Sequence, residues 1–157
     1  MLVRFEGETK ARLWGDDTII FSIGKNDVLL DNHAKTLAVS PQEFEMNLRK
    51  LILFAKRHAT RVILMETLPI DEKRVNPIPW LTTHSYKSED IKHYNEIIKK
   101  VSEKENVPLI EIYSKLINTD FENLLEDGIH PNTEGHKFIC EEVKEYLVKN
   151  KIIDLEG

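Results

Sequence analysis

Three short apolar runs, separated by longer segments with a helical period, constrain the fold of this chain most. The runs are "DTIIFSI" at residues 17–23, "RVILMETL" at 61–68 and "VPLIEIY" at 107–113. Continuous apolar runs of this length are typical of strands that are buried on both faces, as in a parallel sheet. We therefore predict three parallel strands.

The segments between and after these runs repeat apolar residues at steps of three and four, which predicts amphipathic helices. These helices are expected at 40–58, 88–106 and 133–150, with Ser40 and Ser88 as N-caps of the first two. Strands that alternate with helices imply right-handed crossovers and helices on both faces of a parallel sheet. The predicted fold class is α/β, with three α/β/α layers.

Length and composition favour one domain over residues 1–157, because two domains in 157 residues would leave both halves with marginal cores. The net charge of −5 is spread over mixed charged residues without a basic stripe, which argues against nucleic-acid binding. No apolar run resembles a membrane span or a signal peptide, and the single cysteine, Cys140, cannot form an internal disulfide. We expect a cytoplasmic protein without a membrane segment, and Cys140 in the core.

The first residues raise a question about the edge of the sheet. "MLVRFEGETKARLW" at 1–14 predicts a helix, but no capping residue precedes it. The strand at 17–23 would lie at the sheet edge, where an uncovered apolar strand invites pairing with another chain. We expect a missing upstream segment, a second copy in a homodimer or another complementing chain to cover it.

Ligand sites in parallel α/β sheets lie beyond the carboxyl ends of the strands. The first strand is followed by "IGKND", in which Gly24 permits a sharp turn and Asn26 offers an amide that can donate to a developing oxyanion. A turn that is merely capped by Asn26 is the alternative interpretation. The long loop at 66–86 contains Trp80 and His84, which either form a wall of the cleft or belong to a surface connection.

The segment "DGIHPN" precedes the last helix and carries the second candidate group. Asp127 and His130 are three residues apart, so both side chains can project to the same side of a turn. A carboxylate beside an imidazole holds its tautomer and stabilises the imidazolium, as a general base requires. A histidine that only caps the helix start is the alternative. His136 faces another side of the helix, so we expect no metal ion and no other cofactor.

Together, "IGKND" and "DGIHPN" resemble the third and fifth sequence blocks of the SGNH hydrolases, the GDSL-type esterases and lipases, and the similarity extends over nearly the whole chain. The resemblance implies a flavodoxin-like parallel sheet and acyl transfer from a small-molecule ester to water. It also implies that Asn26, in the turn after Gly24, donates to the oxyanion, that His130 is the base and that Asp127 is its partner.

The chain departs from this family at its start. The family's nucleophilic serine lies in a G-D-S motif, and a second block supplies an oxyanion-hole glycine, but the only "GD" here, Gly15-Asp16, precedes a strand. We expect both blocks and the first two strands to lie upstream of Met1, so that the chain is truncated relative to the family. Ser22 is expected to pack or to form local hydrogen bonds. Ser85 lies in the long loop, and the sequence does not show an arrangement that would bring it to the cleft.

Two functions follow from these observations. The first is an esterase, lipase or acylhydrolase of the SGNH type whose nucleophile is not evident in the chain. The second is a non-catalytic remnant or interaction module that keeps the crevice and pairs with a partner through strand 17–23.

Overall fold

The structure is a computed structural model that describes residues 5, 7 and 17–154. Its central sheet contains β1 (Thr18–Ser22), β4 (Arg61–Met65) and β6 (Leu109–Ile110) in the order β1-β4-β6. Both pairings are parallel. The predicted parallel strands are confirmed, whereas the predicted helix at 1–14 lies outside the described residues apart from Phe5 and Gly7.

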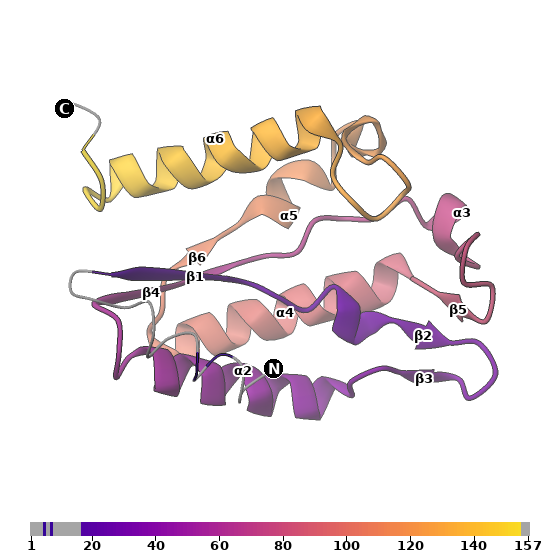
Figure 1. Cartoon of the computed structure of the whole chain (residues 1–157), viewed down its shortest axis with the longest axis horizontal. Helices are drawn as coiled ribbons and strands as arrows, with labels where there is room; N and C mark the ends of the chain where they lie inside the picture. The colour runs from indigo at the N-terminus through magenta and orange to yellow at the C-terminus, as the bar shows by residue number, and fades with distance from the viewer. Residues whose placement is uncertain (1–4, 6, 8–16, 155–157) are drawn as a thin grey trace.

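Helices cover both faces of this sheet (Figure 1). Helices α2 (Pro41–Ala55) and α4 (Ser88–Glu105) lie side by side on one face. Helix α6 (Thr133–Lys149) and the short α5 (Ile112–Leu116) lie on the other. The three α/β/α layers predicted from the sequence are therefore confirmed.

The third apolar run is only partly a strand. β6 ends at Ile110, and the rest of the run begins α5 instead. The buried carboxylate of Glu66, directly after β4, accepts the Ser114 N–H at 3.1 Å and the Ser114 hydroxyl at 3.3 Å. These bonds stabilise the first turn of α5. The apolar pattern of the run could not predict them, because Glu66 lies 48 residues before Ser114.

Of the two N-caps predicted from the sequence, Ser40 is confirmed. Ser40 accepts the Glu43 N–H ahead of α2, and Asn132 accepts the Gly135 N–H at 3.0 Å ahead of α6. The predicted cap by Ser88 is wrong, because Ser88 is already inside α4. Its N–H donates to the carboxylate of Glu72 at 2.8 Å, so a side chain distant in sequence takes up this backbone donor.

The long segment 66–86 is more ordered than a plain surface loop. It contains α3 (Glu72–Val75) and β5 (His84–Ser85). β5 pairs antiparallel with β2 (Leu30–Asp31), which pairs with β3 (Thr36–Leu37) in a small second sheet. These strands have two residues each, too few to produce an alternating pattern in the sequence. Within residues 17–154, two 3₁₀ helices complete the elements, η1 (Asn26–Val28) and η2 (Phe121–Leu124).

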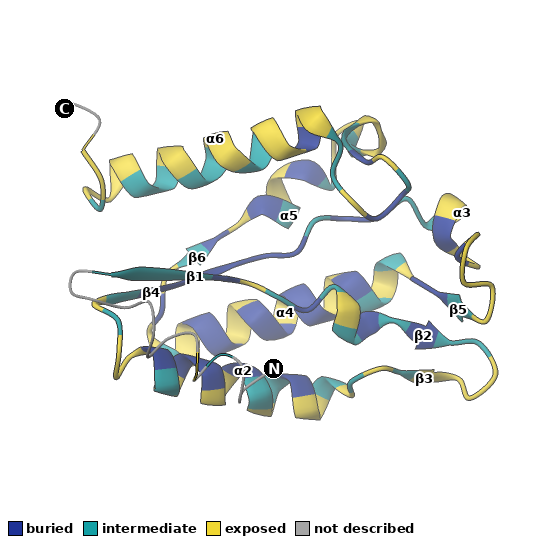
Figure 2. Cartoon of the chain, viewed as in Figure 1, coloured by how far each residue is buried: buried dark blue, intermediate teal, exposed yellow. Residues whose placement is uncertain are grey.

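The two helical layers differ in burial (Figure 2). The apolar stripes of α2 and α4 are fully buried, with Leu48 at 1% and Val101 at 0% exposure. In α6 only Gly135 is buried, and the stripe is otherwise half-exposed. Cys140 is exposed, so its predicted core position is wrong. It lies beside the stripe of Phe138, Ile139, Val143, Tyr146 and Leu147, which contacts the sheet.

Within residues 17–154, β1 pairs with β4 and with no other strand. Its Phe21 ring contacts Phe5, with ring centroids 5.2 Å apart. The prediction that a further strand or chain covers this edge stays a prediction. None of the described helices is both long and apolar enough to cross a bilayer.

Candidate active site

A cavity of about 430 Å³ lies at the carboxyl ends of β1 and β4, beside the start of α6. Its polar lining residues come from three separate parts of the chain. Ser22, Lys25 and Asn26 follow or end β1, Glu66 follows β4, and His130 precedes α6. The crevice expected at the strand ends is therefore present, and it contains two of the predicted site residues.

The Asp127 and His130 side chains form a hydrogen-bonded pair. Asp127 Oδ2 lies 2.7 Å from His130 Nδ1. The other carboxylate oxygen, Oδ1, accepts the backbone N–H groups of Ile129 at 2.9 Å and His130 at 2.8 Å. An ionised carboxylate only accepts hydrogen bonds, so Nδ1 carries the proton and Nε2 keeps its lone pair. The His130 side chain is 69% exposed, so this second nitrogen can meet a ligand.

The same contacts set the charge state of Asp127. Partial burial by itself would raise the pKa of the Asp127 carboxyl. The backbone N–H and ring of His130, together with the Ile129 N–H, outweigh this effect and lower the pKa to about 2. Asp127 is therefore ionised at neutral pH and keeps the histidine ring in one orientation.

Helix α3 holds the loop that carries this pair. Gly128 has φ +94°, and a Cβ there would lie 2.9 Å from Val75 Cγ1. Asp71 donates its N–H to the Gly128 carbonyl at 2.9 Å, and the Arg74 guanidinium donates to the carbonyl of Glu126. The loop is thus fixed by backbone and side-chain bonds from a segment about 55 residues earlier, as expected for a site that must hold its geometry.

Asn26 approaches the cavity from the other side. Gly24 has φ +116°, and a Cβ there would lie 3.1 Å from Phe44 Cζ, so glycine suits this turn. The Asp27 N–H donates to the Gly24 carbonyl at 3.1 Å, which closes the turn. The Asn26 side chain lines the cavity, is exposed and bonds to no residue that the structure describes. Its amide is free to donate to a ligand.

Ser22 lies at the carboxyl end of β1 and lines the same cavity. The expectation that it packs or bonds locally is wrong. Its side chain is exposed because β1 is the edge strand of the described sheet, and no described group bonds to it. Thr67, the other hydroxyl residue of the lining, is buried and hydrogen-bonded to Asn95.

Trp80 and His84 do not line this cavity. Trp80 is 58% exposed, and His84 belongs to β5, where its ring is 2.9 Å from the Thr83 hydroxyl. The small antiparallel sheet directs this part of the long segment away from the strand ends. Ser85 is buried in β5, and its hydroxyl has no hydrogen-bond partner among the described atoms.

Three ionisable residues of the lining were not anticipated from the sequence: Lys25, Glu66 and His136. Burial raises the pKa of Glu66, against the opposing effect of its bonds to Ser114. Burial lowers the pKa of Lys25 to about 7, although Asp127 acts in the opposite direction. The sequence did contain a signal that Lys25 belongs to the site, because it lies within "IGKND", next to Asn26.

Across the described ranges, no three His, Cys, Asp or Glu side chains cluster so as to hold a metal ion.

Known proteins resemble this chain in sequence and in fold. The model of the GDSL-like lipase/acylhydrolase family matches residues 1–138. An arylesterase from Vibrio mimicus is 26% identical over 134 residues, which are 85% of this chain and 57% of that protein. The chain thus spans less than two thirds of the length of this curated relative.

Two solved structures share the architecture. A lipase/acylhydrolase from Enterococcus faecalis aligns with a TM-score of 0.73 and 21% identity, over 93% of this chain and 67% of that one. The acetyl xylan esterase AlAXEase aligns with a TM-score of 0.74 and 21% identity, over 93% and 73% of the two chains. At this identity they show a shared fold. Because the family model covers most of the sequence, the chain belongs to the GDSL-like lipase/acylhydrolase family.

Proposed function

We propose that this chain carries the base and an oxyanion donor of an ester hydrolase that acts on a small-molecule ester. One observation carries the proposal. His130, joined to Asp127 at 2.7 Å, and Asn26, whose amide bonds to no described residue, line one cavity at the carboxyl ends of the strands. Family membership and the names of the relatives support ester chemistry.

Each group has a defined role in this reaction. His130 Nε2 takes the proton of a hydroxyl nucleophile as its oxygen bonds to the ester carbonyl carbon. Asp127 stabilises the imidazolium, and Asn26 Nδ2 donates to the oxyanion of the tetrahedral intermediate. His130 then returns the proton to the leaving alcohol as the ester C–O bond breaks. Water repeats the cycle on the acyl intermediate and releases the acid.

The nucleophile is the open part of the proposal. We propose a serine outside this chain's described residues, on a strand that pairs in parallel with the edge of β1 that no described strand covers. Such a strand would end beside Ser22 and therefore at the cavity, because parallel strands share their carboxyl edge. Ser22 itself is the internal alternative, since its side chain lines the cavity and no described group bonds to its hydroxyl.

Intact-mass measurement after treatment with a fluorophosphonate tests the proposal. The wild-type chain is compared with His130→Ala and Ser22→Ala. A mass increase lost in His130→Ala supports the base assignment, and its loss in Ser22→Ala as well would identify Ser22 as the nucleophile. A label that is kept in His130→Ala would contradict the assignment of His130.

If the chain alone takes no label, the same measurement is made on any longer form that adds a G-D-S segment before Met1. Hydrolysis of p-nitrophenyl acetate by that form should fall about 10³-fold or more in His130→Ala. An unlabelled and inactive longer form would contradict the ester hydrolase and favour an interaction module.

A further inference from the structure

The Lys25 ammonium lies at the junction of the two loops that form the cavity. Lys25 Nζ donates to the carbonyl of Leu68 at 2.6 Å and to the carbonyl of Pro69 at 3.3 Å. The chain separation is 43 residues for the first contact, so the bond joins the turn after β1 to the segment after β4. Lys25 directly precedes Asn26 and lines the same cavity as His130.

The segment that receives these bonds is itself anchored in the core. Thr67 donates its N–H to Asn95 Oδ1 at 2.9 Å, and Asn95 Nδ2 donates to the Thr67 carbonyl at 3.2 Å. Asn95 belongs to α4 and is 3% exposed. A lysine bonded to the two carbonyls after Thr67 is therefore tied to a fixed part of the fold, and it can hold Asn26 in place.

The electrostatic surroundings of Lys25 concern the same site. Asp127 is the carboxylate whose attraction favours the charged form of Lys25, against the burial that favours the neutral form. Glu66, from the end of β4, and His130 and His136, from the segment before α6 and its first turn, are the other titratable groups of the cavity lining. Lys25 and His130 thus line one cavity, and Asp127 is close enough to favour the charged form of Lys25.

We propose that Lys25 is a positioning residue, which holds the Asn26 turn against the segment after β4 and lines the cavity beside His130, within electrostatic reach of Asp127. The inference deepens the proposed function, because Lys25 acts through Asn26 and Asp127. Its tests use no ester. If the Lys25 tests give a negative result, the fluorophosphonate labelling result is not affected. If the labelling gives a negative result, the Lys25 tests can still be interpreted.

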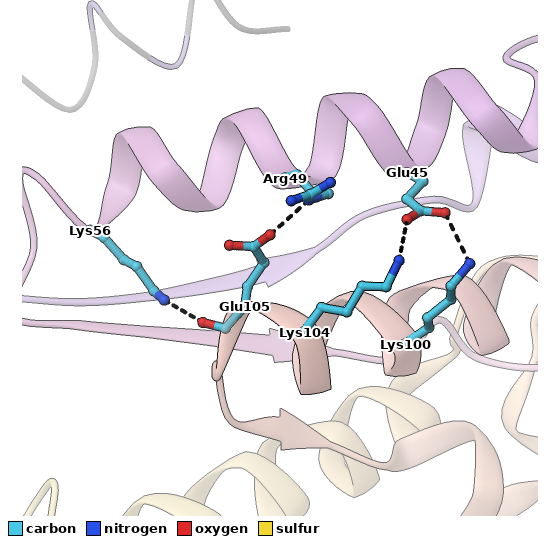
Figure 3. A network of polar contacts seen from close by, with 6 residues as sticks. All are labelled: Glu45, Arg49, Lys56, Lys100, Lys104 and Glu105. Atoms are coloured by element: carbon cyan, nitrogen blue, oxygen red, sulfur yellow. Dashed lines mark hydrogen bonds and ion pairs between the residues drawn. The ribbon is translucent and has the colours of Figure 1, made fainter.

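The first test is amide hydrogen exchange of the Asp27 N–H, whose bond to Gly24 closes the Asn26 turn. In Lys25→Met, exchange at this amide should be about tenfold faster or more, and Lys25→Arg should restore it toward the wild-type rate. Lys56→Met is the matched control, since Lys56 also donates to a distant backbone carbonyl, that of Glu105, between α2 and α4 (Figure 3). If a folded Lys25→Met protein exchanges the Asp27 N–H within about twofold of the wild-type rate, Lys25 does not hold the Asn26 turn and the first half of the proposal is wrong.

The second test measures the coupling to Asp127 and retains Lys25, so it stands even where Lys25→Met does not fold. The pKa of Lys25, about 7 in the wild type, is followed by NMR of its side chain. Coupling between two groups is reciprocal. Asp127→Asn should therefore lower the Lys25 pKa further, by about half a unit or more.

Glu105→Gln, which removes a carboxylate at the far end of α4, should leave the Lys25 titration unchanged. An Asp127→Asn variant in which Lys25 titrates as in the wild type would overturn the second half of the proposal. The signals of Glu66, His130 and His136 are followed in the same titration, so that a change in any of them is separated from the change at Lys25.

Discussion

The two faces of the central sheet differ in how completely they are covered, and the candidate site belongs to the less covered one. Under α2 and α4 the side chains form a closed core, in which Leu48 is 1% and Ile52 0% exposed. Under α6 the buried sheet residues, such as Ile63, are packed against helix residues that are only partly buried, such as Val143 and Leu147. The closed face holds the fold together, whereas the open face leaves room for a ligand.

Exposed ion pairs also join the two helices of the closed face. The exposed sides of α2 and α4 are joined by Glu45 with Lys100 and Lys104 at 3.4 and 3.3 Å, and by Arg49 with Glu105 at 2.7 Å (Figure 3). Such exposed pairs add little stability individually. They orient two helices whose buried faces already match. The comparison therefore predicts that stability depends mainly on the face opposite the cavity.

The largest effect is expected from truncation of the closed core. Leu48→Ala should lower the free energy of unfolding by about 3 kcal/mol, because it removes buried methyl groups and leaves a cavity. Leu147→Ala on α6 should cost only about 1 kcal/mol, since its side chain is already partly hydrated. Urea denaturation measures both. Equal losses would contradict the asymmetry between the two faces.

A smaller loss, about 2 kcal/mol, is expected from Gly135→Ala at the one fully buried position of α6. The added Cβ would lie 2.3 Å from the Leu124 carbonyl oxygen and 2.9 Å from Pro131 Cβ, so the helix start must shift. Thermal denaturation should show this loss, and Cys140→Ala on the exposed side of the same helix should leave the midpoint nearly unchanged. Equal midpoints for Gly135→Ala and Cys140→Ala would show that the start of α6 can shift on the sheet without loss of stability.

The Asp127 loop sharpens the comparison through its pH dependence. The pKa of Asp127 is about 2 in the fold, below its usual 3.8, so the charged carboxylate stabilises the native state. This contribution is complete above about pH 5 and is lost as the pH falls through 2. After discounting for solvent screening, Asp127→Asn should cost about 1 kcal/mol at pH 7. The difference from wild type should shrink toward zero as the pH falls through about 2; denaturation curves in which it keeps its full size there would refute this origin.

The smallest effect is expected from Glu45→Gln, which removes both ion pairs to Lys100 and Lys104. Because these charges are exposed, the change in the denaturation midpoint should be slight at low salt and should disappear at about 1 M salt. A large loss that does not depend on salt would show that these pairs, rather than the buried stripes, hold α2 and α4 together.

The sequence predicted the order of strands and helices because each is encoded by a local apolar period. It also predicted that Asn26 and His130 belong to one crevice, since both lie at carboxyl ends of strands or just before a helix. It failed where contacts are made by side chains distant in sequence. Glu72 takes the N–H that Ser88 was expected to cap, and Glu66 stabilises a helical turn inside an apolar run.

By itself the sequence determined an α/β fold with a parallel sheet, and it indicated the family through two motifs. The tertiary structure decided the rest of the site. It directed Trp80 and His84 away from the cavity, exposed Ser22 at a sheet edge and aimed Lys25 at carbonyls 43 and 44 residues away. The physical reason is that periodicity reports which face of an element is buried, whereas hydrogen-bond partners and depth of burial depend on elements that meet only in the folded chain.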